Sequence, residues 1–224
     1  MNILKFDDNL SQAKALAKAV SSSLSKIITQ QGCATLAVSG GKSPKLFLQL
    51  LSKTPIEWDK VTITLVDERF TDTKSEDSNE HMIRSNLLIN NAEAALFIGL
   101  VTTRDIVACI ANANLQIKSI DIVVLGMGDD GHTASIFPCC NELNHALELD
   151  GAVEKYVVTR PTTANYERIG LSLYGISDSK KIFVSINSLN KLNIITEASH
   201  NIDKKYPISY VLANNKSLDV YWHN

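Results

Sequence analysis

The chain has 224 residues, of which 45% are hydrophobic and 21% charged, and its formal net charge is −2. This is the composition of an ordinary globular protein, and the length predicts a single domain over residues 1–224. The near-zero charge argues against a nucleic-acid partner, which would require a strongly basic surface. Because the sequence has neither a long apolar run nor a signal-peptide pattern, we expect a cytoplasmic protein without a membrane partner. We also expect a monomer or a weak homo-oligomer.

The four cysteines predict no metal or redox chemistry. They form no C-x-x-C pair and two are adjacent, which suits neither a zinc site nor a disulfide framework. Cys33 and Cys109 lie in apolar runs and are expected to be buried. Cys139 and Cys140 are expected to be structural, because the sequence indicates no group that would stabilise a thiolate.

Apolar strands and amphipathic helices alternate along the chain. In chain order we expect a helix at 9–31, a strand at 33–39, a helix at 43–53, a strand at 61–67, helices at 78–89 and 104–117, strands at 120–126, 155–159, 168–173 and 181–186, a helix at 189–199 and an edge strand at 217–222. Gly32 is the expected C-cap of the first helix, and Ser43 the N-cap of the second, with Pro44 in its first position.

This alternation is typical of β-α-β units. The predicted fold class is therefore α/β: a single-domain, Rossmann-like sandwich with a mainly parallel sheet flanked by helices on both faces. Ligands of such folds bind beyond the carboxyl ends of the strands. Those ends fall at 39–41, 67–69 and 126–132.

The first strand end, in "SGGKSP", has features of a phosphate-binding loop. Gly40 and Gly41 allow a ligand to approach the backbone closely, and the following helix start favours an anion. Lys42 adds a cation and Ser43 a hydroxyl group. The Walker A pattern is absent, so a phosphate monoester is favoured over a nucleoside triphosphate. The alternative is a tight turn with a solvated lysine.

The second strand end, "LVDERF", places Asp67 and Arg69 on the same side of a strand, because side chains alternate. A carboxylate and a guanidinium at the mouth of a sheet could orient a hydroxyl group and neutralise a phosphate. A surface turn would also explain three consecutive charges.

The third strand end, "DIVVLGMGDDGHTASIFP", contains a literal G-x-G-x-x-G. A dinucleotide site would need a long helix after the third glycine, but Pro138 follows too soon and the aspartates of the loop would repel a pyrophosphate. The loop instead offers His132 two residues after Asp130, a pairing suited to general acid–base catalysis. Its glycines are expected to leave backbone N–H groups free for an oxyanion. Ser135 is a weaker candidate, since no G-x-S-x-G elbow supports it.

Taken together, "SGGKSP", "DERF...DSN" and "LGMGDDGHTASIFP" resemble the 6-phosphogluconolactonases over essentially the whole chain. The resemblance implies a fold of the sugar-phosphate isomerase type and hydrolysis of 6-phosphogluconolactone, a small sugar-phosphate lactone. It implies His132 as general base with Asp130 as its partner, and Asp67 and Arg69 as the active-site pair. The phosphate-binding residues that it implies are Gly40, Gly41, Lys42, Ser43, Arg168 and Lys191. No metal and no cofactor are expected, because the sequence has no cluster with metal-ligand spacing.

The sequence departs from the family pattern at three places, one of which is a poorly matched turn near residue 160. Thr71 and Asp72 replace a usual V-P after "DERF", which should loosen that loop. Ser188 stands where the family often has glycine before Lys191, which makes the phosphate-binding role of Lys191 less secure.

Two other functions are compatible with parts of this sequence. One is a glucosamine-6-phosphate deaminase/isomerase, which carries a glutamate soon after the histidine, whereas here the next carboxylate is Glu142. The other is a non-catalytic sugar-phosphate-binding protein, which would not need the pair of His132 and Asp130. Both carboxylate and imidazole are present, which favours catalysis.

Overall fold

The computed structural model describes residues 1–215 and 217–224. The strands are β1 (Asn2–Phe6), β2 (Ala34–Val38), β3 (Val61–Leu65), β4 (Asp67–Arg69), β5 (Leu96–Ile98), β6 (Ile122–Leu125), β7 (Tyr156–Thr159), β8 (Arg168–Leu171), β9 (Lys181–Asn187) and β10 (Leu218–His223). The α-helices are α1 (Asn9–Gln31), α2 (Lys45–Leu51), α3 (Asn79–Asn86), α4 (Ile106–Gln116), α5 (Leu143–Ala146), α6 (Leu173–Ser177), α7 (Leu189–Ala198) and α8 (Ile208–Asn214).

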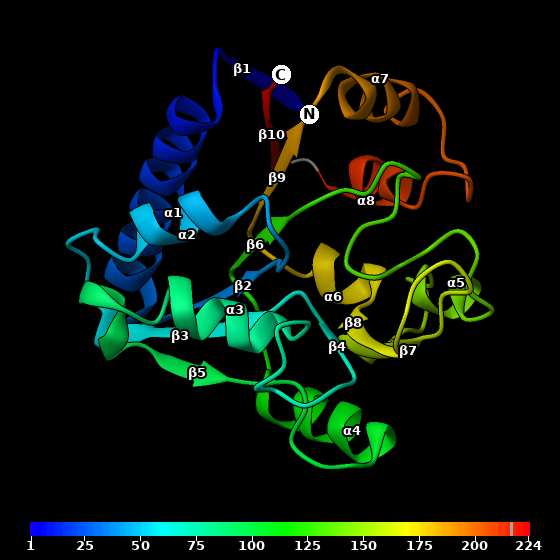
Figure 1. The fold of residues 1–224 in the computed structure, drawn as a ribbon, viewed down its shortest axis with the longest axis horizontal. Coiled ribbons are helices and arrows are strands. Elements are labelled where there is room, and N and C mark those ends of the chain that lie inside the picture. Colours follow the sequence, from blue (N-terminus) through cyan, green and yellow to red (C-terminus); the bar gives the residue numbers. More distant parts are fainter. Residues whose placement is uncertain (216) are drawn as a thin grey trace.

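The main sheet is parallel throughout, in the order β1-β10-β9-β6-β2-β3-β5. Helices α1 and α2 lie on one side of it and α6, α7 and α8 on the other (Figure 1). All four residues of the central strand β6 are buried, as expected for a sheet covered on both faces. The predicted α/β fold class is confirmed.

The register of the central strands brings the expected loops together. Val38 is paired with Leu65 on one side and with Val124 on the other, so β2, β3 and β6 end at nearly the same level. The loops that follow these strands therefore start side by side at one edge of the sheet.

A second, antiparallel sheet has the order β4-β8-β7. The predicted strand 61–67 is wrong at its end, because the chain changes sheets at Val66. The Val66 N–H donates to Val38 O at 2.9 Å, whereas its C=O accepts from Leu171 N at 2.9 Å, in line with β8. The predicted strands at 155–159 and 168–173 form this second sheet and do not join the main one.

Other boundaries also differ from expectation. The strand predicted at 217–222 is not an edge strand, because β10 lies between β9 and the unpredicted strand β1. Helix α2 has Pro44 at its N-cap, and Ser43 lies one residue too early to reach the N–H groups of the first turn. Gly32 does cap α1, with a φ of 89° and its N–H donating to Ile28 O.

Candidate active site

A cavity of about 850 Å³ opens at the carboxyl ends of β2, β6 and β9. Every residue predicted for the site lines it: Gly40, Gly41, Lys42, Ser43, Asp67, Arg69, Asp130, His132, Arg168 and Lys191. These residues, which span Gly40 to Lys191 in the sequence, thus contribute to one cavity, because the parallel strands end at the same edge.

The loop between β2 and α2 presents hydrogen-bond donors to this cavity. Gly41 has a φ of 92°, a conformation that favours glycine. In the part of the chain that the structure describes, the N–H groups of Gly41, Lys42 and Ser43 donate to no protein acceptor. Unpaired N–H groups beside a lysine and the start of a helix form a suitable environment for an anion.

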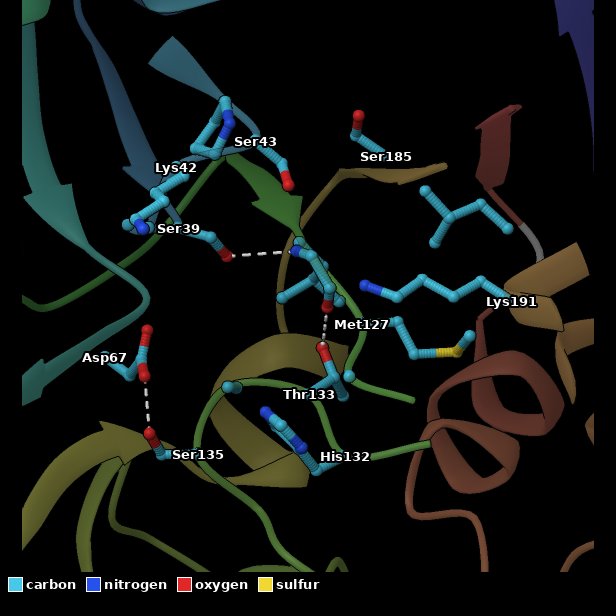
Figure 2. Close-up of a pocket in the computed structure, with 18 of the residues that line it drawn as sticks. Ser39, Lys42, Ser43, Asp67, Met127, His132, Thr133, Ser135, Ser185 and Lys191 are labelled. Atoms are coloured by element: carbon cyan, nitrogen blue, oxygen red, sulfur yellow. Dashed lines mark hydrogen bonds between the residues drawn. The ribbon is translucent and has the colours of Figure 1, made fainter. Parts of the chain in front are cut away.

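Strand β4 carries the acidic and basic pair. Asp67 and Arg69 line the cavity, whereas Glu68 between them is fully buried, as alternation along a strand requires. The Asp67 carboxylate accepts a hydrogen bond from Ser135 Oγ (Figure 2). Arg69 Nη1 donates to the backbone C=O of Asp77. Both cavity-facing side chains are thus held by neighbouring loops.

Arg69 lies directly opposite Arg168 in the antiparallel pairing of β4 and β8. Like charges in this position destabilise a sheet, and the buried Nε atoms of both arginines have no hydrogen-bond partner among the described residues. Burial lowers the pKa of Arg168; Asp67 opposes this effect and Arg69 adds to it. An anion bound beside the two guanidinium groups would relieve this repulsion.

His132 is oriented by a short hydrogen bond. Its Nδ1 lies 2.5 Å from Asp130 Oδ1, and its ring stacks on Phe137 at a centroid distance of 4.0 Å and an angle of 25°. Burial raises the pKa of Asp130, but the hydrogen bond and charge of His132 outweigh this effect, so that the pKa is lowered. Nδ1 is occupied, and Nε2 is the nitrogen left for a substrate or water. Gly128 makes room for the ring, because a Cβ there would lie 2.2 Å from the imidazole.

The predicted oxyanion donors on the glycines of this loop are wrong. Gly126 N–H donates to Ser39 Oγ at 3.1 Å (Figure 2), Gly128 N–H to His132 O at 2.9 Å and Gly131 N–H to Gly128 O at 3.1 Å. These donors are therefore already used, two of them within the loop and that of Gly126 by Ser39. Within residues 126–132, the N–H groups without an acceptor in the described chain are those of Met127, Asp129 and Asp130.

The loop after His132 has an unusual backbone. Ala134 and Ser135 both have positive φ, at 52° and 60°, where non-glycine residues are uncommon. Instead of a helix, this segment forms a tight bridge between Thr133 and Ile136. The turn directs Ser135 Oγ toward Asp67, a contact that nothing in the letters "TAS" indicates. Such backbone strain in a loop that lines a cavity is typical of functional sites.

Lys191 extends from the first turn of α7 into the cavity (Figure 2). Ser188, which precedes that helix, has a φ of 69° and a ψ of 150°, a region that is essentially reserved for glycine. This conformation favours glycine, which the family that the sequence resembles often has here, whereas this chain has serine. Ser188 Oγ also accepts a hydrogen bond from Lys191 N at 3.4 Å, so the lysine is kept in register.

Sequence reasoning missed Asn79 as a site residue. It lines the cavity, and its side chain donates to Asp67 O at 2.8 Å. Asn79 is the last residue of the motif "DERF...DSN", so the resemblance was the signal that could have marked it. Its position directly after the N-cap residue Ser78 otherwise indicates only the start of a helix.

The cysteines depart from expectation in two cases. Cys33 is exposed, because it lies between the C-cap of α1 and the first residue of β2. Cys109 and Cys140 are buried, as their apolar settings would suggest. Burial raises the pKa of Cys139, but hydrogen bonds from Thr163 and its neighbour outweigh this and lower the pKa to about 7. The thiolate-stabilising neighbour is therefore supplied by a distant loop.

Glu142 does not reach the site. It accepts hydrogen bonds from Arg160, with Arg160 Nη1 at 3.0 Å from Glu142 Oε1, and it is not part of the cavity lining. The carboxylate that a deaminase would need after the histidine is thus directed elsewhere. Within residues 1–215 and 217–224, no group of His, Cys, Asp and Glu side chains is arranged to hold a metal ion, and no helix could span a membrane.

Comparison with known proteins identifies the family. The sequence profile of the family described as "Glucosamine-6-phosphate isomerases/6-phosphogluconolactonase" matches residues 7–222. The chain belongs to this family.

Relatives within the family are similar over nearly their whole length. A 6-phosphogluconolactonase of Neisseria meningitidis is 37% identical over 214 residues, covering 93% of this chain and 92% of the relative. One of Mesorhizobium japonicum is 39% identical over 224 residues, covering 97% and 93%. The crystal structure of a 6-phosphogluconolactonase from Shewanella baltica has a TM-score of 0.95 at 37% identity and covers 100% of this chain and 98% of that one. The resemblance seen in the sequence motifs is confirmed.

Proposed function

We propose that this protein hydrolyses 6-phosphogluconolactone to 6-phosphogluconate with His132 as the general base. The observation that carries the proposal is the imidazole of His132, held by Asp130 at 2.5 Å through Nδ1, in a cavity that also contains four cationic side chains. The relatives that share this chain's length are 6-phosphogluconolactonases, which supports the choice of substrate.

The reaction begins at His132. Neutral Nε2 takes a proton from a water molecule that attacks the lactone carbonyl, and Asp130 stabilises the imidazolium that results. The protonated imidazole then returns its proton to the departing ring oxygen. A single histidine thus serves first as base and then as acid.

The tetrahedral oxyanion requires nearby donors. Arg69 and the free N–H groups of the loop, such as those of Met127 and Asp129, are the candidates, since the glycine N–H groups are already used. Asp67, held by Ser135, is positioned to accept a hydrogen bond from a sugar hydroxyl. Both roles rely on donors and acceptors that are in place before the substrate binds.

The phosphate would bind at the cationic part of the cavity. The loop of residues 40–43 offers unpaired N–H groups, and Lys42, Arg168 and Lys191 offer charge. Among these cations, a bound phosphate should stabilise the charge of Arg168 most, because this side chain is buried opposite Arg69.

The test is lactonase activity on freshly generated 6-phosphogluconolactone, measured above the spontaneous rate, for the wild type and His132→Asn. Loss of a general base should lower kcat by about 10²–10⁴-fold. Unchanged circular dichroism and unchanged affinity for 6-phosphogluconate would show that the variant is folded with its cavity intact.

Two results would contradict the proposal. A His132→Asn variant with near-full activity would remove the histidine from the mechanism, and Asp67 would be the next base to test. An inactive wild type that still binds 6-phosphogluconate would indicate a non-catalytic sugar-phosphate-binding protein.

We further propose that residues 1–224 act as one catalytic domain, because the cavity takes residues from α1 through to β10. A charged sugar phosphate as substrate favours a cytoplasmic location and a role without nucleic acid. Sedimentation of the purified protein would distinguish a monomer from a weak homo-oligomer.

A further inference from the structure

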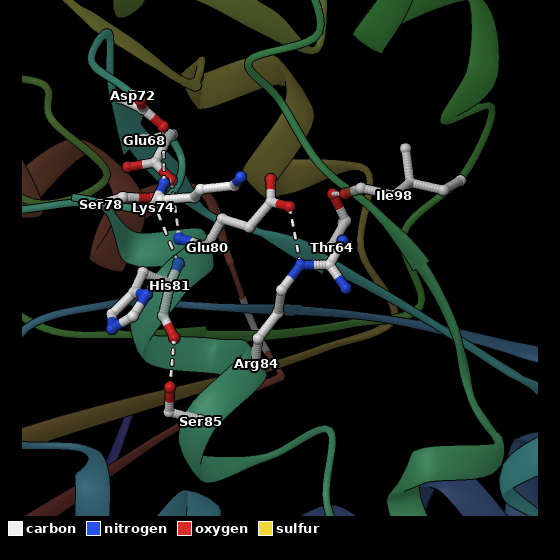
Figure 3. Close-up of polar contacts among 10 residues, drawn as sticks. All are labelled: Thr64, Glu68, Asp72, Lys74, Ser78, Glu80, His81, Arg84, Ser85 and Ile98. Carbon is white, nitrogen blue, oxygen red and sulfur yellow. Dashed lines mark hydrogen bonds and ion pairs between the residues drawn. The ribbon is translucent and has the colours of Figure 1, made fainter. Parts of the chain in front are cut away.

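Glu68 is a buried carboxylate that the proposed reaction does not use. It lies on β4 between Asp67 and Arg69, and its side chain is 0% exposed. It faces away from the cavity, toward the start of helix α3 (Figure 3). A buried carboxylate is costly unless hydrogen bonds compensate for the lost water.

Four donors converge on the two oxygens of Glu68. Oε1 accepts from Arg69 N at 2.6 Å and from Asn79 N at 2.8 Å, and Oε2 accepts from Ser78 Oγ at 2.9 Å and from Glu80 N at 2.7 Å. Burial raises the pKa of Glu68, and these hydrogen bonds only partly offset the effect. Three of the four donors belong to the N-terminus of α3, so this carboxylate caps the helix from a neighbouring strand.

The helix residue fixed in this way is Asn79. Its backbone N–H binds Glu68, and its side-chain Nδ2 donates to Asp67 O at 2.8 Å. The same side chain, 3% exposed, packs against Gly40, where a Cβ would lie only 2.0 Å from Asn79 Oδ1. Asn79 therefore fills the space between strand β4 and the loop of residues 40–43, with no room to move toward either.

We propose that Glu68 is a positioning residue which, through Asn79, sets the distance between the strand that carries Asp67 and Arg69 and the loop of residues 40–43. The inference rests on the proposed lactonase function, for which these two segments must contact the same substrate. Glu68 touches neither the substrate nor the reacting atoms. Its effect is on the spacing between the hydroxyl-binding and phosphate-binding parts of the cavity.

Only a carboxylate meets the demands of this position. All four neighbours are donors, so both oxygens must be acceptors. In Glu68→Gln one oxygen becomes an NH₂ group that faces two donors, and at least one of these hydrogen bonds is lost. The start of α3 should then shift away from β4, and Asn79 with it.

The test compares Glu68→Gln with Asp105→Ala. Asp105 caps α4, with its Oδ1 accepting from Val107 N at 2.9 Å, and α4 contributes no residue to the cavity. Both changes remove an acceptor from a helix N-terminus. We expect Glu68→Gln to lower kcat/KM by about 10–100-fold, because catalytic groups displaced by a fraction of an ångström lose much of their effect. Asp105→Ala should keep the wild-type kcat and KM at a temperature where both variants are folded.

A second variant keeps the inference testable if Glu68→Gln does not fold. Asn79→Ala retains the backbone N–H that Glu68 binds but removes the side chain that spans the gap. It should cause a similar loss, with a higher KM as well as a lower kcat, and the double variant should be no worse than either single one. Additive losses would mean that Glu68 does not act through Asn79.

The inference is overturned if folded Glu68→Gln, or Asn79→Ala, keeps the wild-type kcat/KM. Affinity for 6-phosphogluconate, measured by calorimetry, separates this failure from failure of the proposed function. If the wild type has no lactonase activity, the function is wrong, and the positioning role then stands or falls on whether the variants bind 6-phosphogluconate about tenfold more weakly.

Discussion

Gly128 determines where the His132 imidazole can lie, and Gly128→Ala tests this directly. Gly128 does not have a positive φ, so alanine is allowed by the backbone. Its Cβ, however, would lie 2.2 Å from both Cε1 and Nδ1 of His132 and 2.8 Å from Asp130 Oδ1. To restore a 3.4 Å contact the ring must withdraw by about 1.2 Å. A misplacement of about 1 Å costs about 10²-fold in rate, or about 2.7 kcal/mol in the barrier.

The matched control is Gly126→Ala, two residues earlier in the same loop. A Cβ at Gly126 meets no protein atom within 4 Å, and its φ is not positive. We expect Gly128→Ala to lower kcat about 10²-fold while the urea midpoint stays the same or rises, because alanine reduces the entropy of the unfolded chain. Gly126→Ala should change KM at most. If Gly128→Ala keeps kcat within a few-fold of wild type, the imidazole does not need the position described here.

Three further outcomes are expected. Ser188→Gly should raise the urea midpoint of unfolding, because the release of about 1–3 kcal/mol of backbone strain exceeds the few tenths of a kcal/mol lost with the N-cap hydrogen bond. Ser188→Ala keeps the strain and loses the N-cap hydrogen bond, so it should lower the midpoint. A higher midpoint for Ser188→Ala than for Ser188→Gly would refute this explanation. 6-Phosphogluconate at about 100 times its Kd should stabilise the wild type against thermal unfolding by about 2.7 kcal/mol. Arg168→Met should lose most of this stabilisation, because it removes the cation opposite Arg69 that would bind the phosphate. The rate at which iodoacetamide alkylates Cys139, measured by mass spectrometry, should rise with pH around a midpoint of about 7. In Thr163→Val this midpoint should shift to higher pH, because the hydroxyl group that stabilises the thiolate is lost. A wild-type midpoint near 9.0 would contradict the assigned hydrogen bond.

The main sheet could be predicted because buried parallel strands read as continuous apolar runs. The strands β2, β6 and β9 were found for this reason, and the loops after β2 and β6 were recognised as site loops. The exchange of sheets at Val66 could not be predicted. It depends on a single residue whose C=O turns toward β8, more than a hundred residues later. Strand β1 was missed because its residues are mostly exposed or half-buried.

Cavity-lining residues could be predicted where the side chain and its loop suggest the chemistry, as with His132 and Lys42, whereas Lys191 was predicted only from the family resemblance. It could not be predicted where tertiary contacts decide the result. The positive φ of Ala134 is not signalled by any glycine, and the role of Asn79 depends on two partners brought together by folding. The glycine N–H groups were wrongly assigned to the oxyanion, because the sequence does not reveal that the loop closes on itself.

The pairing of β1 with β10 also affects how the protein can be made. Asn2 lies opposite Asp219, and β10 is the neighbour that β1 has in the sheet. Strand β1 must therefore wait for a partner that is synthesised more than 200 residues later before it can dock. Until β10 has been made, the backbone groups of β1 lack the partners that they have in the folded sheet. We expect chains halted before residue 218 to be cleaved by protease within residues 2–6, and full-length chains to be protected there.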